Sequence, residues 1–535
     1  MPKAILREEA MDFLGSVELA WQMEQEQAEP KHKLQVNEFV GFAAFAYEKL
    51  RNLVDYKDDV LLRKNAIRRL LRQRAMFTGV VKDETNAQDL LRELVLSRYL
   101  PNNTVAVTKA DEITKVIRKY RELIQELKNH THFTSDIRQW ILGIEAVEIE
   151  HLLVEDPIRH PLTAYSYKLI QPVYRQISRE PDDQVYRRQL VITIQRILEK
   201  ADADILSYHL IRHLFSDWFS GSVVSVEASV DGWLRLYQDI QKQLAYPLAS
   251  RLQSIVRKSL VPFIVLRNLI RAHEFKDLGE LLTNPEKISR QTEESYSDYY
   301  TKLRIKIRRK GLHAMAYIFL TKMVLAIVIE LPYERYVLGS INKVALFINL
   351  LVPPLLMLLI TLLITSPGKQ SIEKLIKGMK EILYGSEEQI FLKIPLARKY
   401  SSFALARFGF GILSAVTFIV SFGLIVYILK KLEFNILSGA LFVFFVSLVS
   451  FFGISLRQQV NTLKVVPGKA NIFTFILDVI SLPMVWFGRW LSNTFDKINI
   501  FVVLLDFFVE LPFKVLLKFL DRWFAFLREK KEEIF

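Results

Sequence analysis

Three ionisable residues in the apolar C-terminal half of this 535-residue chain are the first candidates for chemistry: Lys322, Asp506 and Glu510. A charged group inside a bilayer costs about 3 kcal/mol or more, so such residues usually mark an ion or substrate pathway. Lys322 lies near the middle of the apolar run 312–331, where it either serves a polar path or snorkels to the membrane surface. Glu330 lies too near the end of that run to be its expected partner.

Asp506 and Glu510 begin a series of charges spaced four residues apart, which Lys514, Lys518 and Arg522 continue. On a helix these charges drift over an arc of about 160°, which leaves a largely apolar opposite side. We expect this segment to lie in the membrane interface, because crossing the bilayer would bury two acids and two bases. Burial in a six-span bundle is the alternative, and only there would Asp506 and Glu510 gain a functional role.

Pro353 and Pro354 interrupt the apolar run 344–365 and are candidates for a hinge. Each proline lacks the backbone N–H of a regular helix, so a kink is expected at this point. Discontinuous helices form the binding sites of some transporters, although well-packed bundles also tolerate proline.

Glu148 and His151 have the spacing that places two metal ligands on one face of a helix. Di-iron bundles need a second such motif and two further glutamates. The other Glu-x-x-His pair, Glu29 and His32, encloses Pro30, which argues against a shared helical face. We therefore expect no metal site here.

His209 and His213 form an i,i+4 pair, but Leu210 stands where the zinc-protease pattern requires glutamate. The chain has no cysteine, no Gly-rich phosphate loop and no nucleophile elbow, which removes the common catalytic and nucleotide-binding signatures. The sequence therefore predicts structural or surface histidines, no cofactor and no enzymatic activity.

Two basic segments are predicted to contact anionic lipid headgroups. The stretch 371–384 has apolar residues on one face and lysines on the other, as in helices that lie on a leaflet. The other segment directly precedes the run 312–331 and should hold that side in the cytoplasm. The candidate lipid contacts are Arg304, Lys306, Arg308, Arg309, Lys310, Lys374, Lys377 and Lys380.

A third basic segment, 61–74, carries charges around most of a predicted helix and follows the acids Asp55, Asp58 and Asp59. We interpret it as a solvated, ion-paired face. Binding to phosphates or lipid headgroups is the alternative.

Composition separates the chain into two parts. Hydrophobic residues make up 51% of the chain, and the long apolar runs and most of the net charge of +14 lie after residue 311. A basic excess in an apolar region favours anionic lipid over nucleic acid, so we expect no nucleic-acid partner.

Residues 1–275 are predicted to form a large soluble, all-helical domain in the cytosol. Nearly every segment has helical periodicity, as in 108–128, TKADEITKVIRKYRELIQELK, and the N-terminus has no signal-peptide core. Alternating runs typical of strands occur only at 102–108 and 221–230, and both are short.

The remaining chain is predicted to form a multi-span α-helical membrane domain, so the whole protein is expected to be all-α. A polar, then polybasic linker spans 276–311, the membrane domain spans 312–456, and amphipathic interfacial or additional membrane helices with a charged cytosolic tail span 457–535. The expected spans are 312–331, 344–365, 408–429 and 434–455. The positive-inside rule then places both termini in the cytoplasm of a multi-pass protein, with the inner or plasma membrane favoured.

Two functions fit this organisation. The first is a non-enzymatic membrane-anchored scaffold or adaptor, in which the cytosolic domain holds a protein partner at the bilayer. The alternative is a channel or secondary transporter with a polar path near Lys322, Asp506 and Glu510.

Overall fold

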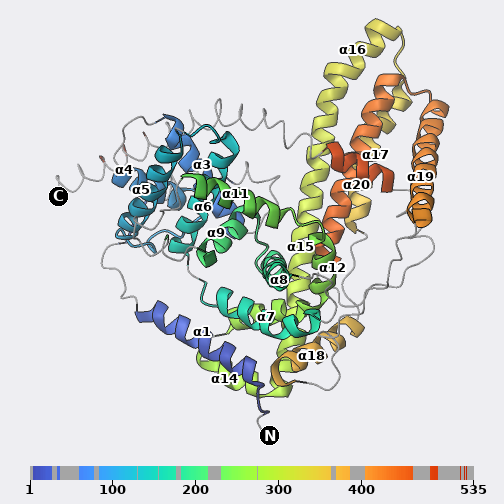
Figure 1. Ribbon diagram of the computed structural model, residues 1–535. Helices are drawn as coiled ribbons and strands as arrows, with labels where there is room; N and C mark the ends of the chain where they lie inside the picture. The colour runs from blue at the N-terminus through green and yellow to red at the C-terminus, as the bar shows by residue number, and fades with distance from the viewer. Residues whose placement is uncertain are drawn as a thin grey trace, which may run out of the picture. The chain divides into compact units, whose positions relative to one another are not determined.

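The secondary structure is helical, apart from turns and one isolated bridge between Lys33 and Ala106 (Figure 1), in the part of the chain that the computed structural model describes. This confirms the all-α prediction. Residues 102–108 form turns and that bridge, and 221–229 lie outside the described residues. The described residues are 4–26, 33–36, 48, 59–77, 83–128, 130–154, 156–175, 182–214, 218, 230–273, 275–362, 369–385, 404–461, 482–491, 519, 523 and 526.

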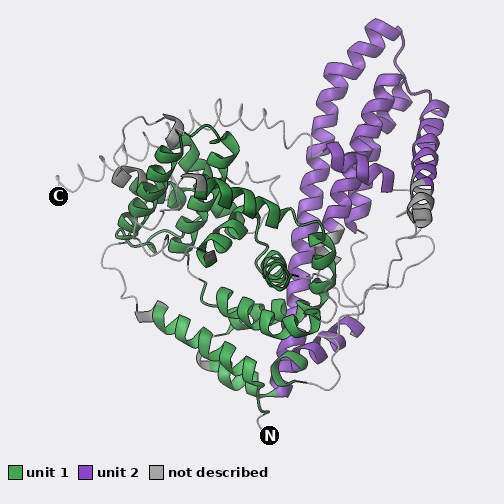
Figure 2. Ribbon diagram, in the orientation of Figure 1, with its two compact units in different colours: residues 1–284, 381–394, 506–535 green, residues 285–380, 395–505 purple. Residues whose placement is uncertain are grey.

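The chain forms two compact units (Figure 2). Unit 1 comprises residues 1–284, 381–394 and 506–535, and unit 2 comprises 285–380 and 395–505. The described helices of the N-terminal part of unit 1 are α1 (Glu8–Glu26), α3 (Asp59–Phe77), α4 (Asp83–Leu96), α5 (Lys109–Lys128), α6 (Ser135–Leu153), α7 (Arg159–Arg175), α8 (Asp183–Leu198), α9 (Ala203–Leu214), α11 (Val230–Leu244), α12 (Ala249–Ser259), α13 (Val261–Ala272) and α14 (Phe275–Thr283).

Helix α6 lies at the centre of a hydrophobic core in unit 1. Thr134 begins it as an N-cap, its side-chain oxygen accepting a hydrogen bond from the backbone N–H of Ile137. The side chains from Trp140 to Glu150 are buried all round the helix, and α3, α5 and α9 pack against it. A helix that is buried on every side brings its polar residues into the core, where each needs a partner.

Unit 2 is built around one long helical path. Its elements are α15 (Pro285–Leu325), the π-helical turn η2 (Ala326–Glu330), α16 (Leu331–Tyr333), the π-helical turn η3 (Glu334–Leu338), α17 (Lys343–Leu362), most of α18 (Lys369–Tyr384), α19 (Ala404–Lys431) and α20 (Ile436–Asn461). Helices α15, α17 and α20 pack against one another, and α19 packs against α20. The segment 276–311, which we expected to be a linker, is helical in α14 and α15 except at the junction between them.

The close approach of α15 and α17 depends on Gly311. A Cβ atom at this position would lie 2.3 Å from Oγ1 of the buried Thr361, so a larger residue would require Thr361 to move. Small residues at such crossings let membrane helices pack closely.

Three stretches of unit 2 are long and apolar enough to cross a membrane: Pro285–Leu338, Lys343–Leu362 and Ile436–Leu456. They contain or overlap the first, second and fourth expected spans. The third expected span, 408–429, lies on α19, whose side chains are described only in part.

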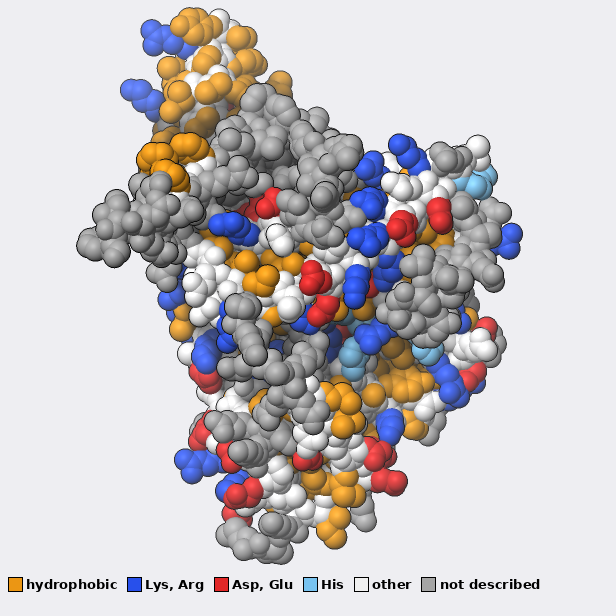
Figure 3. All heavy atoms as spheres, turned by 90° about the vertical axis from the view of Figure 1, so that its left-hand side faces the viewer, with side chains coloured by type: hydrophobic (Ala, Val, Ile, Leu, Met, Phe, Trp, Pro, Cys, Tyr) orange, Lys and Arg blue, Asp and Glu red, His pale blue; other side chains and the backbone are white. Residues whose placement is uncertain are grey.

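Apolar side chains remain exposed along these stretches. Ile327, Val328 and Val337 are 57%, 64% and 67% exposed. Hydrophobic side chains predominate at the top of Figure 3, which is the height of α16 in Figure 1. Apolar exposure of this extent on helices of spanning length indicates that unit 2 associates with a membrane.

Candidate functional site

Lys322 is buried inside unit 2 and only 3% exposed. Its Nζ atom donates hydrogen bonds to both the backbone oxygen and the side-chain oxygen of Asn349 on α17. It also lies 5.0 Å from the ring centroid of Phe445 on α20. The snorkelling alternative is therefore wrong for this arrangement, because the amine points into the helix bundle.

The acceptor for Lys322 exists because of Pro353. In a regular helix the N–H of residue 353 would bond to the carbonyl oxygen of Asn349, but proline has no N–H. The carbonyl oxygen of Asn349 is therefore free to accept from Lys322. Pro353 and Pro354 are both buried, and α17 continues as a helix through them. Pro353 thus leaves a backbone acceptor for Lys322 inside the bundle, a role that was not part of the expected hinge.

Asn349 connects Lys322 to Glu330. Its Nδ2 atom donates to Oε1 of Glu330 at 2.6 Å and lies 3.4 Å from the backbone oxygen of Ser438. The expectation that Glu330 lies too near the end of its run was wrong, because the helical path extends through η2, α16 and η3 to Leu338. Glu330 thus lies within the helical path and not at its end, and its side chain is buried, with 3% exposed.

Glu334 forms the second half of the site and is 1% exposed. Its Oε1 accepts from Nδ2 of Asn435 at 2.7 Å and from Oγ of Ser438 at 3.5 Å. Its Oε2 accepts from the backbone N–H of Asn342 at 3.2 Å. The side-chain oxygens of Asn342 and Asn435 also accept from backbone N–H groups at the starts of α17 and α20. These caps fix both asparagines beside the carboxylate.

We call this group the polar cluster: Lys322, Glu330, Glu334, Asn342, Asn349, Asn435 and Ser438. Lys322, Glu330 and Glu334 come from one helical path, and the π-helical turns help to keep them on the same side of it. Residues four apart drift around a regular α-helix, whereas the i→i+5 bonding of η2 and η3 widens the turn and reduces that drift. Single π-helical turns occur frequently at functional sites.

The charges of the polar cluster are unequal. The cluster contains one amine and two carboxyl groups, so when fully ionised it carries one net negative charge among buried side chains. Burying an unbalanced charge is unfavourable, and one proton or one monovalent cation would neutralise it. The arrangement is therefore chemically suited to bind a single positive charge.

Sequence reasoning identified Lys322, Pro353 and Pro354 but missed Glu330, Glu334 and Asn349. A local signal was present, because Asn349 stands four residues before Pro353. Asp506 and Glu510, the other two intramembrane candidates, lie outside the described residues.

The predicted lipid contacts on α15 are on accessible positions. Lys306 and Arg309 are exposed, and Arg304, Arg308 and Lys310 are half-buried. Their contact with anionic lipid remains a prediction.

Helix α18 differs from the expected leaflet helix. Its apolar residues Leu375, Met379, Ile382 and Leu383 are at most 1% exposed, so this face packs within the protein. At its C-terminal end, within unit 1, the backbone oxygen of Leu383 accepts from the N–H of Arg7 at 2.9 Å. The expectation that the apolar face meets lipid is thus corrected.

The lysines opposite that face, Lys374, Lys377 and Lys380, are exposed, and their contact with lipid headgroups stays a prediction.

The basic segment 61–74 lies on α3. The predicted ion pairing is confirmed, but Lys64 is buried and not solvated. Lys64 is 1% exposed and lies 2.5 Å from Asp202 and 2.7 Å from Asp204, while Arg68 lies 2.8 Å from Asp204. These four residues form what we call the ion-pair web. Its acids come from the α8–α9 connection and α9, far along the chain, and the expected partners Asp55 and Asp58 lie outside the described residues.

No group of three or more histidine or acidic side chains is arranged to hold a metal ion in the part of the chain that the structure describes. Glu148 instead accepts from Nζ of Lys119 at 2.6 Å and from the hydroxyl of Tyr120 at 2.7 Å. His209 is buried and His213 is exposed.

No protein-family model matches the chain, and comparisons with curated proteins and with solved structures give no significant match.

Proposed function

We propose that the protein is a multi-pass membrane protein whose polar cluster binds a proton or a monovalent cation during transport. It would be a secondary transporter or a channel with four spans and both termini in the cytoplasm of an inner or plasma membrane. The observation that supports this proposal is the burial of Lys322, Glu330 and Glu334 on apolar helices, where Asn349 and Ser438 link them. Ionisable groups at such positions in membrane proteins commonly form proton relays and ion pathways.

The hydrogen bonds suggest how binding could affect helix packing. Asn349 on α17 donates to Glu330 on η2 and lies near the backbone oxygen of Ser438 on α20. A proton on Glu330 turns an acceptor into a donor, which weakens the bond from Asn349. Loading would therefore change the contacts among all three candidate spans, as alternating access requires.

The test is proton uptake by the full chain in liposomes that enclose a pH-sensitive dye. We expect Lys322→Leu and Glu334→Gln each to lower the initial rate about tenfold or more, the equivalent of about 1.4 kcal/mol. Glu433→Gln is the matched control, since Glu433 is exposed at the turn between α19 and α20. Equal rates in all four proteins, or no uptake driven by any imposed H⁺, Na⁺ or K⁺ gradient, would contradict the proposal.

The membrane-anchored, non-enzymatic scaffold is the second candidate. One observation favours it: in the described residues, no side-chain atom of the polar cluster is both buried and without a partner, as expected of a fixed clamp. In this case the cluster would stabilise the bundle, and unit 1 would hold a cytosolic protein. Photo-crosslinking from exposed positions of unit 1 in intact cells tests it, and a lack of any crosslinked protein partner would oppose it.

A further inference from the structure

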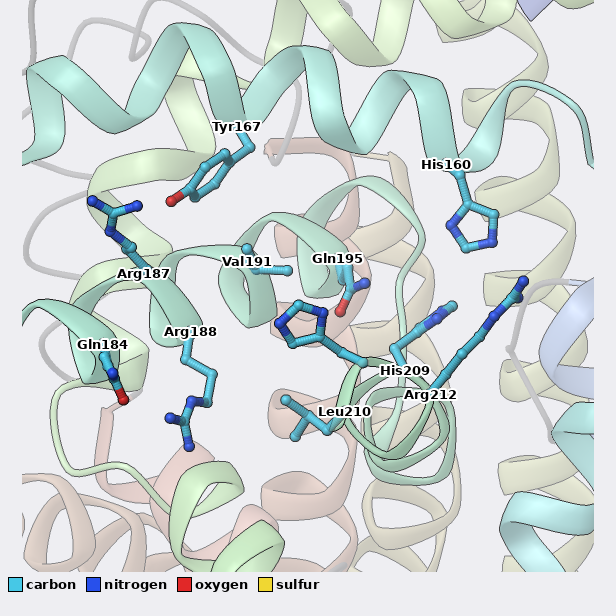
Figure 4. A pocket seen from close by; sticks show the side chains of 11 residues that line it. His160, Tyr167, Gln184, Arg187, Arg188, Val191, Gln195, His209, Leu210 and Arg212 are labelled. Atoms are coloured by element: carbon cyan, nitrogen blue, oxygen red, sulfur yellow. The ribbon is translucent and has the colours of Figure 1, made fainter. Parts of the chain in front are cut away.

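A pocket of about 890 Å³ opens in unit 1 among α7, α8 and α9 (Figure 4). Its volume lies in the range of small-molecule sites. The lining residues are His160, Tyr167, Gln184, Arg187, Arg188, Val191, Gln195, His209, Leu210, Arg212 and His213.

The lining is cationic. Its three arginines supply the positive charge, and no carboxylate stands among the lining residues that the structure describes. Burial lowers the pKa of His160 to about 4, so this histidine is neutral near pH 7. Figure 4 shows Arg187 and Arg188 toward one end of the pocket and Arg212 with His160 toward the other. Like charges gathered around one cavity repel each other, and a bound anion would relieve that repulsion.

The nearby acids are already engaged. Asp183 lies 2.6 Å from Arg187 and 3.2 Å from Arg175, so it neutralises only the outer edge of the pocket. Glu199 lies 3.5 Å from Nε2 of His209 and accepts from the hydroxyl of Thr163 at 2.9 Å.

Arg188 and Arg212 differ from Arg187 in this respect. Over the described part of the chain, no carboxylate forms an ion pair with either of them. Arg188 is half-buried and Arg212 is exposed, and the side-chain hydrogen bond of Arg212 is to the neutral hydroxyl of Tyr208.

The neutral lining residues complete the chemistry of the site. Gln184, Gln195 and Tyr167 can donate hydrogen bonds, and desolvation raises the pKa of Tyr167, which keeps its hydroxyl protonated. Val191 and Leu210 provide an apolar surface. Arginine presents a planar fork that matches phosphate oxygens in a bidentate manner. The combination fits a compound with both anionic and organic parts.

We propose that this pocket binds a phosphate-bearing small molecule, whose anionic oxygens are held by Arg188 and Arg212. The proposal does not depend on the transport function of unit 2. The phosphate could belong to a soluble metabolite or to the headgroup of a lipid, and both present the same oxygens to the arginines.

The experiment measures binding to the full chain in nanodiscs of neutral lipid by isothermal titration calorimetry. The probes are pyrophosphate and ATP for a soluble source, and dioctanoyl phosphatidic acid for a lipid source. We expect at least one probe to bind and its affinity to fall as salt rises. In the double variant Arg188→Gln/Arg212→Gln the affinity should fall about tenfold or more, because two charge-assisted contacts are lost.

Arg235→Gln is the control, since Arg235 is an exposed arginine of unit 1 that does not line the pocket. It should bind like the wild type, and the circular dichroism of all variants should agree. Binding of pyrophosphate or ATP assigns a soluble source, and binding of phosphatidic acid alone assigns a headgroup. No binding of any probe at millimolar concentration, or equal affinity in the double variant, would overturn the proposal.

Discussion

In unit 1 the buried Lys64 lies between two aspartates, whereas in unit 2 the buried Lys322 lies against the backbone and side chain of one asparagine. Lys64 makes direct ion pairs, and Arg68 brings a second cation to Asp204. Two cations and two carboxylates therefore balance in the ion-pair web. The polar cluster contains one amine and two carboxyl groups, and Asn349 lies between the amine of Lys322 and the carboxyl group of Glu330.

The two arrangements of buried charge suit different roles, one in stability and one in binding. A balanced web of direct pairs needs nothing further and is costly to break, so it suits a fixed junction between helices. An unbalanced cluster linked by neutral amides can gain one positive charge, which changes its hydrogen bonds without breaking an ion pair. This difference supports a stabilising role for the ion-pair web and the binding role that we propose for the polar cluster.

The substitution of Lys64 is predicted to have the largest effect, a loss of stability of unit 1. Lys64→Met would leave two buried or half-buried aspartates against one arginine, and removing one partner of a buried pair typically costs 3–5 kcal/mol. We expect the free energy of unfolding of unit 1 to fall by roughly 4 kcal/mol. Urea unfolding in nanodiscs, followed by tryptophan fluorescence, measures it.

Two further lysine variants show whether the comparison holds. Lys242→Met removes a lysine that is 76% exposed, so the change should stay below about 1 kcal/mol. Lys322→Met removes a donor from two neutral oxygens and should destabilise unit 2 by about 2 kcal/mol. A loss from Lys322→Met as large as that from Lys64→Met would erase the distinction between the two regions.

The second prediction concerns the proline that frees the acceptor of Lys322. Pro353→Ala restores an N–H that can bond to the carbonyl oxygen of Asn349 and compete with the amine. We expect the rate of proton uptake in liposomes to fall about fivefold, because a charge-assisted bond weakens by roughly 1 kcal/mol.

Pro354→Ala is the matched control, because it restores the bond to Leu350 and leaves Asn349 unaffected. It should keep the rate of the wild type. Similar rates for the two alanine variants would mean that the prolines act together as a hinge, as the sequence suggested.

The smallest predicted effect is the pH dependence of unit 1. Burial, together with the positive charge of Arg159, lowers the pKa of His151 well below its usual value near 6.5. The unfolded chain takes up a proton below pH 6.5 that the folded state does not accept, so stability is lost as pH falls below this value. We expect the melting temperature of unit 1 to decrease by about 3 °C between pH 7 and pH 5.5 from this group.

His151→Gln removes the titrating group and should flatten that part of the pH profile. The control, His213→Gln, replaces an exposed histidine and should leave the slope unchanged. Equal slopes in the wild type and His151→Gln would assign the pH dependence to other groups.

The helices and the apolar stretches were predictable because their signals are local. Helical periodicity identified the stripe on α5, where Ile113, Val116, Tyr120 and Leu127 are buried. Long apolar runs located the candidate spans. The buried partners of α3 were not predictable, since the nearest acids in sequence are not the ones that pair with Lys64.

By itself the sequence determined that the protein is all-α, that the apolar part follows residue 311, and that Lys322 and Pro353 stand at depth within it. Only the tertiary structure decided that these two residues meet at Asn349 and that Glu330 and Glu334 join them. The reason is the range of the interactions. Periodicity acts over one helical turn, whereas Lys322 and Asn349 are 27 residues apart and Asn435 and Glu334 are 101 residues apart. Such contacts depend on how the helices pack.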